Sequence, residues 1–199
     1  MNAQRTETFC TIPGSQPERD GERQLIFRVA RGDRIAFDAL YRVYRGRLTH
    51  FVGRLVRHPH LVEEVLDDTL MVVWEHAADF KGESKLSTWI FAIAYRKAMR
   101  ALRRYDVPFE DVDADFRASG EAGPEEIHAQ SRLHDVLQRA LVNLSADHRA
   151  VIELTYFHDL GYREIAEIMD CPVDTVKTRM FYARRHLKGF LDGELPDWI

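Results

Sequence analysis

The sequence has little cysteine and no long hydrophobic run, and each absence excludes a class of protein. Its only two cysteines, Cys10 and Cys171, lie far apart, which argues against a disulfide framework and a cysteine-based zinc site. No apolar run approaches the roughly 18 residues that a membrane-spanning helix needs, so no direct membrane insertion is expected. Residues 1–22 are polar and lack the apolar stretch of a secretory signal. These features predict a reduced, soluble, cytoplasmic protein.

Motifs for catalysis and metal binding are also missing. The nine histidines show no His-x-x-x-His or His-Glu-x-x-His spacing, and His58 and His60 flank Pro59 in an expected turn, where histidines are typically solvated. No serine, cysteine or carboxylate constellation stands out. We therefore predict no catalytic residue, no metal site, no cofactor and no small-molecule substrate, and the chain is not expected to be an enzyme.

What the sequence does have is a sharp segregation of charge. Lys and Arg number 28 and Asp and Glu 32, for a formal net charge of −4. Residues 25–57, 91–104 and 173–188 are rich in Lys and Arg, whereas residues 61–80 and 106–126 are rich in acids. Basic helical segments suggest contacts with a polyanion, and the acidic stretches keep the total near neutral. The isolated chain is thus expected to bind DNA weakly.

Hydrophobic periodicity points to helices throughout. Apolar residues recur at three- and four-residue steps from Leu25 onward, and no segment alternates as a strand would. His58-Pro59 interrupts the first pattern, because the residue before a proline avoids the helical region. We predict an all-α fold of two small helical domains. The expected parts are a disordered N-terminal extension (1–22), a helical domain (23–104), a flexible acidic linker (105–130), a helix-turn-helix domain (131–191) and a tail (192–199).

The second domain carries a helix-turn-helix pattern. Residues 162–169 form a short amphipathic helix, Pro172 cannot continue it, and residues 173–187 form a second, basic helix. Ser145 is expected to cap the helix before them. A tight turn followed by a basic helix with small polar residues at its start is typical of DNA reading. The alternative is an ordinary helical hairpin whose basic face is only solvated.

Two runs in this domain resemble a known family. Residues 170–185, DCPVDTVKTRMFYARR, closely resemble the recognition helix of extracytoplasmic-function (ECF) sigma factors, the small bacterial transcription initiation factors. Residues 144–154, LSADHRAVIEL, resemble the start of the C-terminal domain of those proteins.

The first domain resembles the same family in three further runs. Residues 62–74, VEEVLDDTLMVVW, look like its polymerase-binding helix, and residues 80–90, FKGESKLSTWI, look like its promoter-melting segment. Residues 93–104 look like the helix that adjoins the upstream promoter element. The motifs follow the family's order over residues 25–104 and 132–190.

This resemblance implies both a fold and a function. It implies a helical bundle similar to sigma region 2, and a helix-turn-helix domain similar to sigma region 4. The implied function is that of an alternative sigma factor, which binds core RNA polymerase through the beta-prime and beta subunits, recognises −10 and −35 promoter elements, and promotes melting of the former. Implied partners are core polymerase, promoter DNA and an anti-sigma factor.

The resemblance also assigns residues to each role. The polymerase-binding residues it implies are Glu63, Glu64, Asp67, Asp68, Leu70, Met71 and Trp74. Those implied for the −10 element and melting are Lys81, Ser84, Lys85, Leu86, Ser87, Arg96, Lys97, Arg100, Arg103 and Arg104. Those implied for the −35 element are Tyr162, Pro172, Thr175, Lys177, Thr178, Arg179, Phe181, Tyr182, Arg184 and Arg185.

Other interpretations of these residues and of the chain stay open. The acidic helix face could simply be solvated, with Trp74 in the core, and Phe80 and Trp89 are expected to anchor the melting segment rather than contact a base. Asp67-Asp68 stands where many relatives have Gln-Glu, and Arg96 follows Tyr95 where several have Asn. The main alternative function is a helix-turn-helix transcriptional regulator that does not act as a sigma subunit. A structural helical adaptor would explain the acidic face but not two basic helices.

Overall fold

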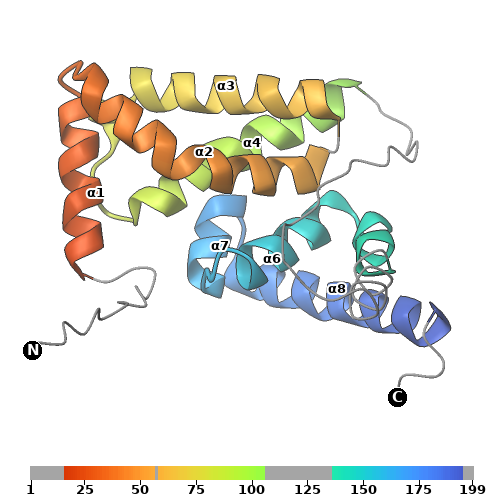
Figure 1. Ribbon diagram of the computed structural model, residues 1–199. Coiled ribbons are helices and arrows are strands. Elements are labelled where there is room, and N and C mark those ends of the chain that lie inside the picture. Colours follow the sequence, from red (N-terminus) through yellow and green to blue (C-terminus); the bar gives the residue numbers. More distant parts are fainter. Residues whose placement is uncertain (1–15, 57, 106–135, 195–199) are drawn as a thin grey trace, which may run out of the picture.

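A computed structural model describes residues 16–56, 58–105 and 136–194, and every regular element in these ranges is a helix. The predicted all-α class is therefore confirmed. The proposed linker lies outside the described residues apart from Tyr105, as do residues 1–15 and 195–199. Helices α1–α4 form the upper part of the molecule and α6–α8 the lower part (Figure 1).

The first pair of helices is α1 (Gln16–Val29) and α2 (Arg34–Val56), joined by a short turn. Gly32 closes α1 in the left-handed region at φ +80°, a conformation that glycine adopts without steric cost. Asp33 then caps α2, because its Oδ1 accepts the backbone N–H groups of Ile35 and Ala36 at 2.9 and 3.1 Å. These bonds lower the pKa of Asp33. Residues 16–22, expected in the extension, thus belong to a helix.

The next elements are α3 (Pro59–Glu75), the short 3₁₀ helix η1 (Ala77–Asp79) and α4 (Leu86–Tyr105). His58 is extended and Pro59 opens α3, as the sequence predicts. Helices α2, α3 and α4 contact one another, and α1 packs against α2. We call α1–α4 the first unit. Its interior is apolar and includes Leu40, Leu48 and Phe91, which are fully buried.

The second unit consists of helical residues 136–142, α6 (Ala146–Tyr156), α7 (Tyr162–Met169) and α8 (Val173–Glu194). Ser145 caps α6 as expected, because its Oγ accepts the N–H of His148 at 3.4 Å. Helix α7 has the bounds that the sequence predicts, whereas α8 runs on to Glu194, into the expected tail. Val176 and Met180 of α8 are buried, so α8 lies across α6 and α7 with one face inward.

The two units pack against each other. Helix α4 contacts α7, and α2 contacts α6, so a single hydrophobic core runs through both units. We call this contact zone the junction. That the two units fold separately, as expected for two domains on a flexible linker, stays a prediction. None of the described helices is both long and apolar enough to cross a membrane.

Candidate functional site

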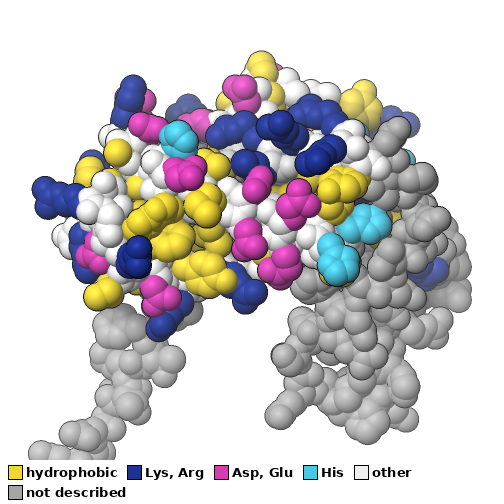
Figure 2. Space-filling model, turned by 90° about the horizontal axis from the view of Figure 1, so that it is seen from above, with side chains coloured by type: hydrophobic (Ala, Val, Ile, Leu, Met, Phe, Trp, Pro, Cys, Tyr) yellow, Lys and Arg dark blue, Asp and Glu magenta, His cyan; other side chains and the backbone are white. Residues whose placement is uncertain are grey.

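The outer surface of α3 carries four exposed acids, Glu63, Glu64, Asp67 and Asp68, which we call the acidic face. Figure 2 looks down on this side of the molecule and shows acidic side chains between hydrophobic patches and a row of basic ones. Met71, one turn beyond Asp67, is 57% exposed and adds an apolar contact point. A surface that mixes charged and apolar groups is suited to binding another protein.

Bonds to neighbouring helices hold part of the acidic face in place. The carboxylate of Asp68 accepts from Lys97 Nζ of α4 at 2.9 Å. Glu63 lies 3.8 Å from Arg45 of α2, and Glu64 accepts from the Tyr105 hydroxyl at 3.4 Å. Because these residues are exposed, each pair contributes little to stability. The bonds tie these three carboxylates to side chains of α2 and α4.

Two residues expected on this surface lie mainly in the core. Leu70 is buried, with 4% of its surface exposed, because α3 packs between α2 and α4 and buries a wide stripe. Trp74 is half-buried and packs edge-on against Phe37, with ring centroids 5.1 Å apart. The assignment of Leu70 to the partner-binding surface is therefore corrected. Met71 is the exposed apolar residue of this surface.

The segment between η1 and α4 is anchored as the sequence predicts. Phe80 is buried and its ring lies 5.5 Å from that of Trp89. Gly82 has φ +75°, and a Cβ there would stand 3.0 Å from the Arg23 guanidinium, so glycine is needed at this turn. Lys81 is exposed and Ser84 half-exposed.

The last part of this segment is less accessible than expected. Leu86 and Ser87 are buried at 3% and 8% exposure, because they begin α4, which packs against α3 and α7. In this arrangement neither side chain can contact a nucleic-acid base. Lys85 Nζ lies 2.6 Å from Glu164 Oε1 of α7 and is therefore engaged by the second unit.

The basic residues of α4 point outward over its last turns. Arg96, Arg100, Arg103 and Arg104 are exposed. Lys97 is half-buried and bound to Asp68 of the acidic face. Exposed arginines on one helix provide the positive charge that phosphate groups bind.

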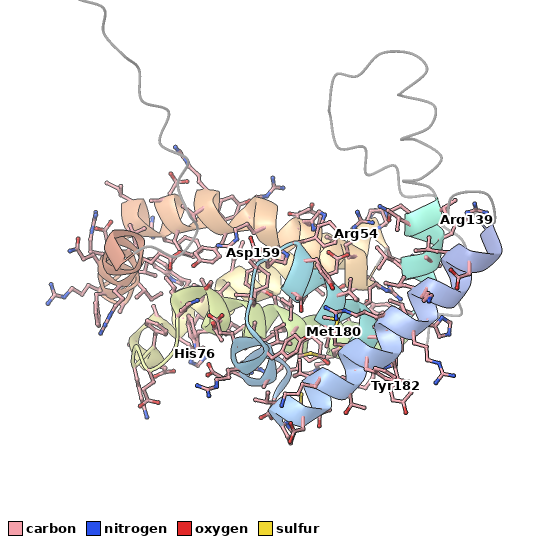
Figure 3. The ribbon with its side chains drawn as sticks, turned by 90° about the horizontal axis from the view of Figure 1, so that it is seen from below. Arg54, His76, Arg139, Asp159, Met180 and Tyr182 are labelled. Atoms are coloured by element: carbon pink, nitrogen blue, oxygen red, sulfur yellow. The ribbon has the colours of Figure 1, made fainter. Side chains whose placement is uncertain are left out.

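Helix α8 presents a second basic surface, on the side of the molecule opposite to the acidic face of α3 (Figure 1). Met180 lies on its inner side and Tyr182 on its outer side in Figure 3, and their exposures of 2% and 51% agree with this. The exposed residues expected to meet DNA are Pro172, Lys177, Thr178, Phe181, Tyr182, Arg184 and Arg185, while Tyr162 and Thr175 are half-exposed.

Local bonds fix several side chains of this helix. Lys177 Nζ binds Asp174 Oδ1 at 2.9 Å, and the Thr178 hydroxyl donates to the Asp174 carbonyl at 2.9 Å. The rings of Phe181 and Tyr182 pack edge to face, 5.5 Å apart. Arg184, one turn on, donates to the Tyr156 hydroxyl at 2.6 Å. The N-terminal half of α8 thus presents polar and aromatic groups together.

Arg179 differs from its neighbours because a carboxylate of α6 holds it. Its Nη2 lies 2.5 Å from Asp147 Oδ2. The same carboxylate accepts the hydroxyl of Tyr95, on α4, at 2.7 Å. Burial of Tyr95 and its bond to Asp147 raise the pKa of that phenol. Asp147 therefore joins a residue of the first unit to a residue of the basic face of α8.

The junction contains further polar groups that the sequence patterns did not single out. Arg149 is buried and donates to the carbonyls of Arg54 and Leu144 at 2.8 and 2.7 Å, which closes two helix ends. Arg54 also donates to Gln138. No spacing motif marks Arg149, since its role depends on helices that meet only in the folded chain.

Two titratable groups at the junction are shifted by burial. Glu153 has no exposed surface and lies 3.8 Å from Arg54 and 3.7 Å from His50; burial raises its pKa to about 7. Its carboxylate oxygens have no hydrogen-bond partner. The His158 ring packs against those of Phe51 and Phe91, at 5.9 and 4.7 Å, and burial lowers its pKa to about 4.

The charged faces of α3, α4 and α8 are the main polar surfaces that the described residues present. Within the described residues no group of three or more His, Cys, Asp or Glu side chains could hold a metal ion. The shallow pocket beside the turn between α7 and α8 is lined by Arg163, Ala166, Glu167, Asp170, Cys171, Pro172 and Val173. An acidic face on one helix and basic faces on two others leave partner binding and nucleic-acid binding as the chemistry that the arrangement supports.

Two family models match the chain in the order of its two units. Sigma-70 region 2 matches residues 40–107, and Sigma-70 region 4 matches residues 134–187. The first match spans most of α2 and all of α3 and α4, which carry the acidic face and the basic end of α4. The second spans α6, α7 and the part of α8 that carries the basic residues.

Individual relatives agree with the family models. The chain is 30% identical over 189 residues to the RNA polymerase sigma-H factor of Pseudomonas aeruginosa, covering 90% of this chain and 98% of the relative. It is 33% identical over 175 residues to the ECF RNA polymerase sigma-E factor of Escherichia coli, covering 82% and 90%. The solved complex of the sigma factor RpoE with the anti-sigma factor NepR from Bartonella quintana contains a chain that matches with a TM-score of 0.64 and 25% identity, over 78% of this chain and 96% of that one.

Proposed function

The chain belongs to the sigma-70 family of RNA polymerase sigma factors, in its ECF group, and from this premise we propose which of its surfaces serves each step of transcription initiation. It is an alternative sigma factor, which directs RNA polymerase to promoters. The observation that carries the proposal is the exposure, on one chain, of an acidic face on α3 and of basic faces on α4 and α8.

The acidic face of α3 is the proposed contact with core polymerase. Its four carboxylates, with Met71 beside them, fit a basic helical partner on the beta-prime subunit better than they fit DNA, which the same charges repel. Trp74 supports this surface from beneath through its contact with Phe37. We assign the beta subunit as a further partner only by the family resemblance.

Promoter recognition is divided between the two units. We assign the −10 element and its melting to Lys81, Ser84, Lys85 and the exposed arginines of α4, and the −35 element to the outer side of α8. Arginines bind phosphates and so position the protein, while Lys177, Thr178 and the aromatic pair lie where base edges can be read. Melting requires that Lys85 leave Glu164, since it is bound there in this structure.

Regulation and location follow from the same premise. An anti-sigma factor is the proposed inhibitor, because a sigma factor similar to this chain has been solved in complex with one. The proposed location is the cytoplasm, where RNA polymerase acts. We propose no catalytic role for the chain itself, since its surfaces act by binding.

In vitro transcription tests the function directly. The purified chain is added to core RNA polymerase with a library of randomised promoter sequences, and transcripts are sequenced. We expect start sites downstream of two short sequence elements at fixed spacing, and co-elution of the chain with core polymerase. Sequence-specific DNA binding that is the same with and without core, together with no transcription, would instead support a regulator that is not a sigma subunit.

A further inference from the structure

The exposed side of α8 carries one acid among its basic and aromatic residues. Asp174 lies in the first turn of this helix, and 89% of its side chain is exposed. It is the only acid among residues 173–191, whereas five of these positions carry Lys or Arg. DNA phosphates repel a carboxylate, so Asp174 lowers the affinity of a DNA-binding surface unless it gains a contact of its own.

Helical geometry places Asp174 in the middle of this exposed side. Successive residues are about 100° apart around an α-helix, so residues three, four, seven and eleven positions apart fall close to one line. The exposed residues on this line are Asp174, Thr178, Phe181 and Arg185. The buried residues on the other side of the helix are Val176, Met180 and Ala183. The carboxylate therefore lies among the residues that we assign to the −35 element.

Two local bonds hold Asp174 in place. Its Oδ1 accepts from Lys177 Nζ at 2.9 Å, and its backbone carbonyl accepts from the Thr178 hydroxyl at 2.9 Å. Within the part of the chain that the structure describes, the second carboxylate oxygen, Oδ2, has no hydrogen-bond partner. The ammonium group of Lys177 has three donors, and this bond uses one of them. The pair thus keeps one acceptor and two donors for a ligand.

A carboxylate can bond to only some of the groups in the major groove of DNA. When ionised it accepts hydrogen bonds and donates none. The donors on base edges in this groove are the N4 amino group of cytosine and the N6 amino group of adenine, whereas guanine and thymine present acceptors. In adenine the amino group lies beside N7, an acceptor that repels a carboxylate. Cytosine is therefore the base that Asp174 fits best.

The pair of Asp174 and Lys177 also matches the edge of a C·G base pair in its spacing. Cytosine N4 and guanine O6 bond to each other within the base pair, so they lie about 2.9 Å apart. The carboxylate oxygen and Nζ of the protein pair have the same separation, 2.9 Å. An acceptor on the protein can therefore face the donor of cytosine while the neighbouring donor faces the acceptor of guanine.

We propose that Asp174 is a specificity-determining residue, whose carboxylate accepts from the N4 amino group of a cytosine in the −35 element while Lys177 donates to the guanine of the same base pair. This inference rests on the proposed function, in which α8 reads that element. Repulsion by phosphates lowers the affinity for every sequence, and the bond to cytosine restores it only for the matching one.

The first experiment changes the acceptor with little change of shape. An asparagine in place of Asp174 can both accept and donate, and asparagine pairs with N6 and N7 of adenine. Holoenzyme, formed from core polymerase and the chain, is bound to promoter duplexes in which each −35 position is varied in turn. At one position, Asp174→Asn should lower the ratio of binding to cytosine over adenine about fivefold, the low end for a base contact.

The matched control is Asp192→Asn, which makes the same substitution at an exposed position of the same helix. It lies about 27 Å further along α8, at a rise of 1.5 Å per residue. This variant should leave the base preference unchanged at every position. If Asp174→Asn instead strengthens binding to all sequences alike, or changes nothing, the carboxylate reads no base and the proposal is overturned.

The second experiment separates a base contact from mere positioning of Lys177. N4-methylcytosine keeps its pairing with guanine but replaces the amino hydrogen that faces the major groove. At the position found above, this base should weaken binding of the parent holoenzyme about fivefold, and that of Asp174→Ala less than twofold. Equal losses in both would mean that Asp174 acts only through Lys177, which also overturns the proposal. The proposed function fails separately, if the parent holoenzyme gives no promoter-specific transcript.

Discussion

The interior of the first unit and the junction between the units are both buried, but they are built from different groups. The interior packs apolar side chains such as Leu40, Leu48 and Phe91. The junction adds Arg149, whose two terminal guanidinium nitrogens donate to helix ends, and Glu153, whose carboxylate oxygens accept no hydrogen bond. An apolar interior gives stability that is insensitive to pH and salt, whereas ionisable groups make a contact depend on both. The difference teaches that two equally buried contacts can respond differently to pH and salt.

The largest expected effect is in the apolar interior. Leu40→Ala removes a fully buried side chain and leaves a cavity, which should lower the free energy of unfolding by about 3–4 kcal/mol. Urea unfolding followed by circular dichroism measures the loss. We expect the loss to be the same at pH 5 and pH 8, since the side chain that is removed does not ionise. A loss below about 1 kcal/mol would show that the first unit is not held by this interior.

A substitution at the junction is expected to raise the free energy of unfolding rather than lower it. The pKa of Glu153 is about 7 in the folded chain against an ordinary value of 4.5, so the folded state holds the proton more tightly and ionisation between these values costs stability. Glu153→Gln mimics the protonated group and should raise the free energy of unfolding by up to about 3 kcal/mol at pH 8. At pH 4.5 and below the difference should vanish.

The pH dependence of this variant then reports on His158. The pKa of His158 is lowered from 6.5 to about 4 by burial, so the unfolded chain binds protons more readily between these values. Stability of Glu153→Gln should therefore fall as the pH drops from about 6.5 to 4. In the parent the two groups act in opposite directions, and its stability should be flatter over this range. A parent and a variant with parallel pH profiles would contradict this account of the junction.

A third prediction asks whether the outer surface of the first unit acts independently of the junction. Reversing Asp67 and Asp68 to arginine should weaken binding to core polymerase roughly thirtyfold, or about 2 kcal/mol, because it puts like charge against a basic partner. Helical content should stay as in the parent. The control reverses Asp38 and Glu83, exposed acids off the acidic face. Equal binding by the Asp67 and Asp68 variant and the parent would remove this surface from the polymerase contact.

The smallest expected effect is at the start of α8. Lys177→Ala should change the preference among −35 sequences by about 1 kcal/mol, the low end for a base contact, since Lys177 already pairs with Asp174. Lys188→Ala, on the same helix and exposed, is the control and should leave the rank order of sequences unchanged. Holoenzyme binding to a panel of −35 variants measures both. A uniform loss for Lys177→Ala would make it a phosphate contact.

Local signals in the sequence predicted many elements well. Pro59 opens α3, Ser145 caps α6, and α7 begins and ends at the predicted residues. These features depend on backbone chemistry within a few residues, which a single sequence contains. The break between α1 and α2 was not predicted, because the apolar period runs through it and only Gly32 and Asp33 mark it.

Features that depend on contacts between distant segments were not predictable. Leu70 shares a helix turn with exposed acids, and only the packing of α3 between two helices shows that it is buried. Lys85 and Arg179 were expected to face DNA, and their carboxylate partners lie 79 and 32 positions away in the sequence. His158 and Glu153 carry no motif, since their shifted pKa values come from burial, which arises only when the helices of the two units pack together.

The carboxylate of Asp147 acts as a counterion that the protein itself supplies to Arg179. When a cation on a protein binds a DNA phosphate, the entropy gain comes largely from ions released by the DNA into solution, and an arginine already neutralised by its own carboxylate must first give that partner up. On Arg179, the DNA phosphate then replaces the carboxylate of Asp147, so one anion is exchanged for another. Arg179 should thus mainly affect the conditions under which the chain binds DNA. Its exposed neighbours on α8 should mainly affect the affinity.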